Sequence, residues 1–150
     1  MAITLAVPDT YGLVLAAATS TFFVNTFHMF RTSKLRKASN IPYPNAYATH
    51  EQAKKDVNAY RFNCAQRAHA NFIENQPSAL GALLISGLHF PVAAAVLGAT
   101  WSVGRTLYLY GYTSSAGPKG RTFGAYIAGV ADLSLKLMAA YTSYLLVAGK

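Results

Sequence analysis

Four long stretches with helical, mainly apolar patterning alternate with polar segments along this chain. The first covers residues 11–30 without a single Asp, Glu, Lys or Arg. At a helical rise of about 1.5 Å per residue, this length crosses a hydrocarbon core of about 30 Å. Further helices are predicted at about residues 62–90, 92–112 and 123–147. The pattern predicts an all-α membrane protein, with residues 1–150 forming one domain whose four transmembrane helices run up and down in a bundle.

The polar segments between these stretches are predicted to be connections. Residues 39–60 contain Pro42 and Pro44, and prolines two positions apart interrupt a helix. Residues 89–91 form a short turn, and residues 113–120 contain the glycines and proline that favour a loop. We therefore expect three connections, two of which are polar.

Basic residues gather in those two polar connections. Lysine and arginine near the ends of membrane spans favour the cytosolic side. Both basic connections are therefore predicted to face the cytosol, with both termini on the opposite side. The basic residues are Arg31, Lys34, Arg36, Lys37, Lys54, Lys55 and Arg61 after the first span, and Lys119 and Arg121 after the third.

Composition supports the membrane assignment. The chain is 53% hydrophobic and 12% charged, about half the charged fraction usual in soluble domains. The net charge of +8 would suggest a nucleic-acid ligand if the basic residues covered a soluble face, but they flank apolar spans, so no nucleic-acid partner is expected. The only cysteine, Cys64, excludes an intrachain disulfide and a cysteine-based metal site, and no metal is expected.

The second predicted helix carries polar side chains among its apolar residues. Arg67, Asn71 and Glu74 follow one another at i, i+4 and i+7 and share one helical face. Charged groups at membrane depth are costly and face the interior of a bundle or a wet cavity. Two interpretations remain open, a ligand site and a simple ion pair between Arg67 and Glu74.

The third predicted helix carries a second polar stripe. Trp101, Arg105, Tyr108 and Tyr112 lie at spacings of four, three and four. Arg105 is expected either to contact a ligand or to pair with an acid such as Glu74, and the tyrosines are also typical of a membrane-interface belt. Together the two helices would form a pocket suited to a small zwitterionic ligand.

The fourth predicted helix contains Asp132 and Lys136 in the favourable i, i+4 order. An ion pair inside the bundle, a subunit contact and a contact along a polar substrate path are all compatible with them. A small transporter built on this pair is a further alternative.

Two segments resemble the MAPEG superfamily, most closely its type 3 microsomal glutathione transferases. They are QRAHANFIE at residues 66–74 and GRTLYLYGY at residues 104–112. The basic run SKLRK at residues 33–37 and the Tyr43–Pro44 pair that follows also fit. The likeness covers nearly the whole chain.

The resemblance implies a homotrimer in the endoplasmic reticulum membrane, with three glutathione sites at subunit interfaces near the cytosolic face. It implies an enzyme that uses glutathione as co-substrate. This enzyme conjugates glutathione to lipophilic electrophiles or reduces lipid hydroperoxides in contact with membrane lipid. The alternative is a non-catalytic lipid-binding adaptor, similar to the lipoxygenase-activating branch of the same superfamily.

The resemblance also implies site residues. Arg121 is expected to stabilise the glutathione thiolate, with Lys119 as the alternative because the loop before it varies in length. Arg36 is expected to contact the ligand or the acceptor from a neighbouring subunit, and Asn75 stands where leukotriene-C-synthase-like relatives carry a tyrosine. Including Arg105 from the stripe described above, the expected glutathione-binding residues are Arg67, His69, Asn71, Glu74, Tyr108, Tyr112, Arg36 and Arg105.

Overall fold

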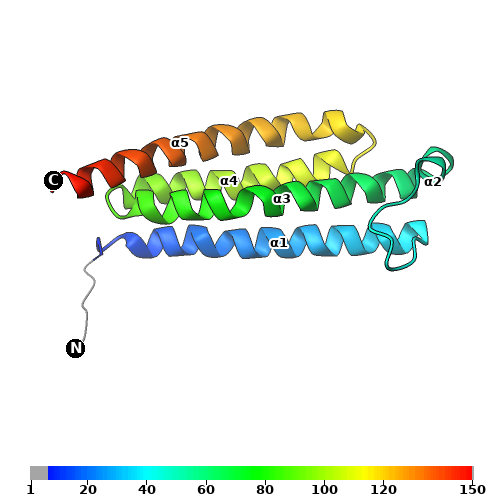
Figure 1. Cartoon of the computed structure of the whole chain (residues 1–150), viewed down its shortest axis with the longest axis horizontal. Coiled ribbons are helices and arrows are strands. Elements are labelled where there is room, and N and C mark those ends of the chain that lie inside the picture. Colours follow the sequence, from blue (N-terminus) through cyan, green and yellow to red (C-terminus); the bar gives the residue numbers. More distant parts are fainter. Residues whose placement is uncertain (1–6, 150) are drawn as a thin grey trace.

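Four long helices lie side by side in the computed structural model, which describes residues 7–149 (Figure 1). The described residues contain no β-strand, which confirms the all-α prediction. A short helix and a 3-10 turn complete the connections. The elements are α1 Tyr11–Ser39, α2 His50–Lys55, α3 Val57–Gly87, α4 Pro91–Tyr112, η1 Gly117–Arg121 and α5 Thr122–Val147.

The two central helices of the arrangement are α3 and α4. Each of them packs against the other and against both α1 and α5, whereas α1 and α5 make no contact with each other within residues 7–149. The connections after α1 and after α4 lie at the same end of the molecule, and α1 begins and α5 ends at the other (Figure 1). The two basic connections therefore share one end.

Helix α1 is longer than the predicted first span. It continues beyond residue 30 to Ser39, because no glycine or proline interrupts it, and it ends where Asn40 adopts a left-handed conformation with φ of 52°. The Asn40 N–H donates to the Lys37 carbonyl, which is a common way to end a helix. The basic residues after position 30 are thus helical.

The prediction of a loop over residues 39–60 was wrong in its second half. Thr49 and Gln52 form a reciprocal capping box that starts α2, a signal that the prolines earlier in the segment do not affect. Asp56 then caps α3 by accepting from the Asn58 N–H. Helix α3 therefore begins five residues before the predicted position of 62.

The remaining helix boundaries lie close to the predicted ones. Helix α3 runs without interruption through Pro77 and ends at Gly87 instead of residue 90. Helix α4 begins at Pro91, which suits the first turn of a helix because it has no N–H to leave unpaired. Helix α5 begins at Thr122, one residue before the prediction.

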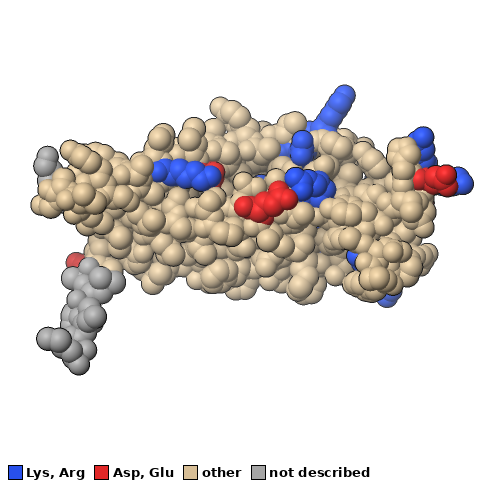
Figure 2. All heavy atoms as spheres, viewed as in Figure 1, with Lys and Arg blue, Asp and Glu red and all other residues tan. Residues whose placement is uncertain are grey.

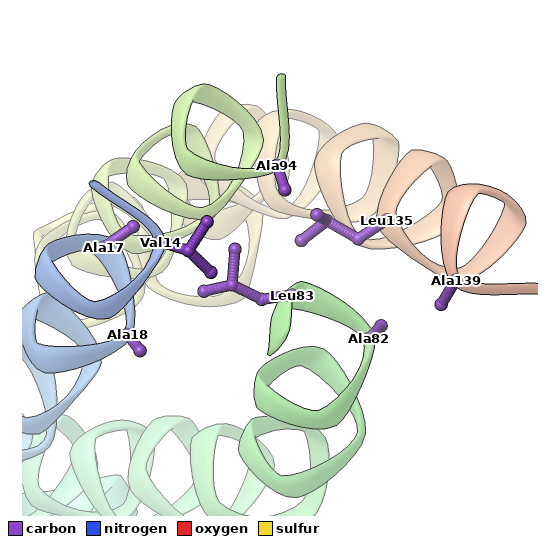
Figure 3. Close-up of a cluster of buried hydrophobic side chains, with 8 residues drawn as sticks. All are labelled: Val14, Ala17, Ala18, Ala82, Leu83, Ala94, Leu135 and Ala139. Atoms are coloured by element: carbon purple, nitrogen blue, oxygen red, sulfur yellow. The ribbon is translucent and has the colours of Figure 1, made fainter. Parts of the chain in front are cut away.

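Small residues allow the helices to pack closely. The largest buried cluster consists of five alanines together with Val14, Leu83 and Leu135 (Figure 3). A Cβ added to Gly104 on α4 would lie 2.7 Å from the backbone nitrogen of Ala128 on α5, so the two backbones are nearly in contact. Close approach through small residues is typical of helices that pack in membranes.

The surface of the bundle is largely apolar. Lys and Arg side chains gather towards the α2 end in the view of Figure 2, and much of the length of the bundle carries few charges. Two stretches among the described residues are long and apolar enough to cross a membrane, Tyr11–Ser39 with mean hydropathy 1.4 and Gly117–Val147 with mean hydropathy 1.3.

Candidate functional site

A pocket of about 460 Å³ opens between α3, α4 and α5, beside η1. Its wall combines cationic, amide, phenolic and carboxylate groups with small apolar residues, and such convergence of polar groups in one cavity is typical of a ligand site. The lining residues are Asn71, Asn75, Trp101, Arg105, Tyr108, Arg121, Thr122, Ala125, Ala128, Gly129 and Asp132.

Helical periodicity brings these residues together. Asn71 and Asn75 lie one turn apart on α3. Trp101, Arg105 and Tyr108 lie at spacings of four and three on one face of α4. On α5, the lining residues between positions 122 and 132 recur every three to four residues. Each helix therefore contributes one face to the pocket.

Arg105 is buried at the centre of this wall, with 5% of its surface exposed. Its Nη2 donates to Asn71 Oδ1 at 3.0 Å, and its guanidinium carbon lies 4.6 Å from the centroid of the Tyr108 ring. The expected alternative, an ion pair with Glu74, does not form. The cation is held by an amide oxygen and by aromatic faces, which attract cations through their quadrupole.

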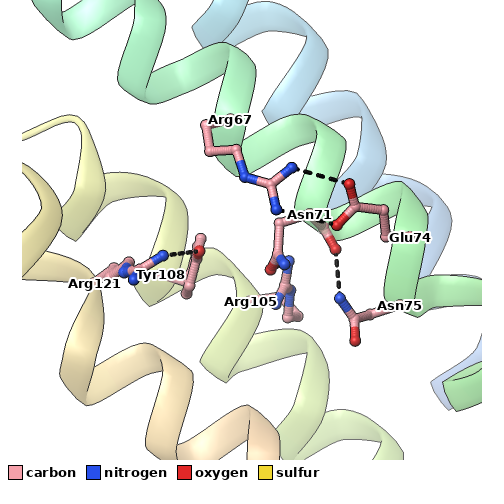
Figure 4. Close-up of polar contacts among 7 residues, drawn as sticks. All are labelled: Arg67, Asn71, Glu74, Asn75, Arg105, Tyr108 and Arg121. Carbon is pink, nitrogen blue, oxygen red and sulfur yellow. Dashed lines mark hydrogen bonds and ion pairs between the residues drawn. The ribbon is translucent and has the colours of Figure 1, made fainter.

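Arg121 lies at the last position of η1 and reaches over two tyrosines of α4. Its Nη1 donates to the Tyr108 hydroxyl oxygen at 3.1 Å (Figure 4). Its guanidinium carbon lies 5.1 Å from the centroid of the Tyr112 ring. Arg121 lines the pocket, whereas Lys119 is exposed and does not. The geometry therefore favours Arg121 over the alternative Lys119.

Arg67 and Glu74 pair with each other on α3. Arg67 Nη1 and Glu74 Oε1 are 2.9 Å apart, and the two side chains are 49% and 52% exposed. Figure 4 shows the pair above Asn71, outside the residues that line the pocket. The predicted shared face is present, and in this structure the two charges compensate each other.

Among the other expected residues, Tyr112 lies beside Arg121 and Tyr108 without lining the pocket. Two expected site residues lie further away in the described chain. His69 faces α1, where its ring centroid is 5.9 Å from that of the buried His28. Arg36 donates to the Asn45 carbonyl oxygen at 2.7 Å and stacks on Phe62. Neither residue lines the pocket. His69 points away from the face of α3 that carries Asn71. Arg36 lies on α1, and α3 and α4 separate α1 from α5.

The pocket also contains residues that the sequence did not assign to a ligand. Asn75 and Asp132 both line it. Asp132 Oδ2 accepts from Lys136 Nζ, so the predicted ion pair forms, but the carboxylate also faces the cavity. The spacing of Arg121, Ala125, Ala128 and Asp132, at four, three and four residues, was the signal available in the sequence.

The arrangement suits an anionic or zwitterionic ligand. Two guanidinium groups and a phenol offer hydrogen-bond donors near η1, and a carboxylate lies towards the far end of the same cavity. No group of three or more histidine, cysteine, aspartate or glutamate side chains in the described chain could hold a metal ion. The guanidinium, phenol and carboxylate groups of the pocket can recognise charged groups, and the guanidinium groups can stabilise an anion.

Comparison with protein families gives a match over most of the chain. The MAPEG family matches residues 14–141, which include the pocket and most of the four long helices. The chain belongs to the MAPEG family. Proteins of this family are membrane proteins, in agreement with the two apolar stretches, and the family includes glutathione transferases and peroxidases as well as other members.

Proposed function

We propose that this MAPEG protein is an integral-membrane glutathione transferase with glutathione-dependent peroxidase activity. The observation that carries the proposal is the position of Arg121, whose guanidinium lines the pocket and is held by the Tyr108 hydroxyl. A preorganised cation in a cavity can stabilise a thiolate, which is the chemical requirement of both reactions.

Glutathione matches the pocket in charge. The tripeptide carries two carboxylates and one ammonium group, and it would lie between Arg105 and Arg121 with Asn71 and Tyr108 as further partners. Arg67 and Glu74 stand beside this pocket. Exposed ion pairs contribute about 0–1 kcal/mol to stability. A ligand carboxylate could therefore replace Glu74 as the partner of Arg67 at small cost. Glu74 could then bind the ammonium group of the ligand.

Arg121 would then activate the thiol. A thiol with a pKa of about 8.5 is mostly protonated at neutral pH. A guanidinium close by favours the thiolate and lowers that pKa, and each unit is worth about 1.4 kcal/mol. The hydrogen bond from Arg121 to Tyr108 holds the guanidinium at the pocket before the ligand arrives.

Two reactions follow from a bound thiolate. In conjugation, the thiolate sulfur attacks an electrophilic carbon of a lipophilic acceptor and forms a C–S bond. The displaced electron pair leaves with a halide, stays on the oxygen of an opened epoxide, or moves out of an activated C=C bond, and in the last two cases a proton is then taken up. In peroxide reduction, the sulfur attacks the terminal oxygen of a lipid hydroperoxide, the O–O bond breaks, and the lipid leaves as an alcohol. A second glutathione then reduces the resulting sulfenic acid to give glutathione disulfide and water.

The proposal includes the oligomeric state, the membrane and the orientation of the enzyme. The family resemblance supports a homotrimer in the endoplasmic reticulum membrane, with all four long helices crossing the bilayer. It also supports glutathione sites at subunit interfaces, where Arg36 of a neighbouring subunit would contribute. The shared end of the two basic connections would face the cytosol.

Purified protein in detergent tests this function. We expect glutathione-dependent turnover of an aryl halide and of a lipid hydroperoxide. Glutathione binding without turnover of either would favour the adaptor alternative. Absence of both binding and turnover would contradict a glutathione site.

A further inference from the structure

The connection between α1 and α2 is fastened to α3 on both sides of Tyr47. Asn63 Oδ1 accepts from the Ala48 N–H at 2.8 Å, and its Nδ2 donates to the Ala48 carbonyl oxygen at 2.9 Å. Gln66 Nε2 donates to the Ala46 carbonyl oxygen at 2.6 Å. These bonds use the backbone of the connection, and none of them uses the Tyr47 hydroxyl. Ala48 is buried, whereas Tyr47 is 45% exposed, so its side chain is open to a ligand.

The residue that holds Ala48 belongs to the face of α3 that carries Arg67. Asn63, Arg67, Asn71 and Glu74 follow one another at spacings of four, four and three. Tyr47 directly precedes Ala48 and therefore lies at the start of this stripe. The Tyr47 phenol and the Arg67 guanidinium are near enough to influence each other electrostatically.

The pair of Arg67 and Glu74 restricts which end of glutathione can bind beside Tyr47. Arg67 Nη1 and Glu74 Oε1 are 2.9 Å apart. A ligand that replaces this contact must therefore offer a carboxylate and an ammonium group close together. In glutathione only the γ-glutamyl residue carries both groups, and it carries them on one carbon atom. The carboxylate expected at Arg67 is thus the α-carboxylate of the γ-glutamyl residue.

We infer that Tyr47 is a further glutathione-binding residue, whose hydroxyl donates a hydrogen bond to the α-carboxylate of the γ-glutamyl residue beside Arg67. The inference rests on the proposed transferase function. A carboxylate has about four lone-pair sites, so two bonds from a guanidinium leave acceptor capacity for a phenol. Hydrogen bonds to an ionised acceptor are stronger than those between neutral groups. Tyr47 therefore anchors the end of the ligand that does not carry the sulfur.

Tyr47→Phe tests this contact by removing only the exposed hydroxyl. We expect calorimetric titration in detergent to show about 3- to 10-fold weaker glutathione binding, as the loss of one hydrogen bond predicts. The KM for glutathione should rise by the same factor, whereas kcat at saturating glutathione should stay close to the wild-type value. Tyr47 does not touch the sulfur, so the split between KM and kcat distinguishes anchoring from catalysis.

Tyr43→Phe is the matched control. Tyr43 lies in the same connection, is 79% exposed and stacks on Arg36 through its ring. The loss of its hydroxyl should leave glutathione affinity unchanged. An unchanged affinity in Tyr47→Phe, or an equal loss in both variants, overturns the inference.

Two dipeptides identify the carboxylate. The γ-glutamylcysteine dipeptide keeps the γ-glutamyl end, and cysteinylglycine keeps only the glycine carboxylate. Tyr47→Phe should weaken binding of γ-glutamylcysteine by the same factor as that of glutathione and leave binding of cysteinylglycine unchanged. A loss confined to cysteinylglycine would place Tyr47 at the glycine carboxylate and contradict the assignment.

Asn63→Ala tests whether the fastened connection positions Tyr47. This variant loses both bonds to Ala48 and should weaken glutathione binding, but it should add little in the Tyr47→Phe background, because both changes act through one contact. Fully additive losses would show that Asn63 does not act through Tyr47. If the wild type binds and turns over glutathione while Tyr47→Phe binds it equally well, the inference alone fails. If the wild type binds no glutathione, the proposed function fails as well.

Discussion

Arg121 is the residue on which the proposed chemistry depends. Arg121→Ala should lower kcat by on the order of 10²-fold, as expected when one preorganised donor to a developing anion is lost. It should also move the rise of kcat to higher pH, because without the cation the bound thiol needs a higher pH to ionise. Steady-state kinetics across pH, together with the ultraviolet absorbance of the bound thiolate, measure both effects.

Lys119→Ala provides the matched control for Arg121→Ala. Both residues belong to η1, but the Lys119 side chain is exposed and does not line the pocket. Its replacement should leave kcat and the pH profile unchanged. A large loss in Lys119→Ala and none in Arg121→Ala would transfer the thiolate-stabilising role to Lys119.

At the scale of the elements, the close packing of α4 and α5 positions Tyr108 for Arg121. A Cβ at Gly124 would overlap the backbone nitrogen of Tyr108, and backbone cannot yield as a flexible side chain can. Gly124→Ala should therefore separate the helices and cost about 1–3 kcal/mol of stability, as overpacking does. We expect a lower midpoint of thermal denaturation in detergent and a lower kcat.

Gly81→Ala is the control at the same scale. Gly81 also lies inside a long helix, but nothing stands within 4 Å of an added Cβ. Alanine is favoured over glycine in a helix by about 1 kcal/mol, so this variant should melt at the same temperature or higher. Equal destabilisation by both variants would show that the contact between α4 and α5 is not the cause.

At the scale of the whole molecule, the two basic connections at one end define the proposed orientation. Helix α2 carries exposed Lys54 and Lys55 at that end. Trypsin added to sealed microsomes should cleave the chain there, because the cytosolic face is outside. Immunoblotting measures the fragments. Protection of this site until detergent opens the vesicles would reverse the orientation, and a luminal marker protein confirms that the vesicles are sealed.

The helices could be predicted from the sequence because helix formation depends largely on local periodicity. The starts of α4 and α5 were predicted to within one residue. The second half of residues 39–60 was mispredicted, since the capping box of Thr49 and Gln52 was outweighed by two prolines that act only on their own neighbourhood. The first span was predicted to end at residue 30 because Arg31 is charged. A charged residue does not end a helix, and α1 continues to Ser39.

The candidate site could be predicted only in part. The shared faces of Arg67, Asn71 and Glu74 and of Arg105 and Tyr108 follow from helical spacing alone. Helical spacing does not predict which residues of other helices these side chains contact. Arg105 donates to Asn71 and not to Glu74, and this pairing depends on how far α3 and α4 are rotated and shifted relative to each other.

The sequence by itself determined the helical architecture, the membrane character and the faces on which polar residues align, since these follow from residue type and local spacing. Only the tertiary structure decided which of those residues meet. Within the described chain it placed His69 against α1, Arg36 away from the pocket and Asp132 in the pocket wall. The physical reason is helix register, which small residues distant in sequence set through close backbone contacts between neighbouring helices.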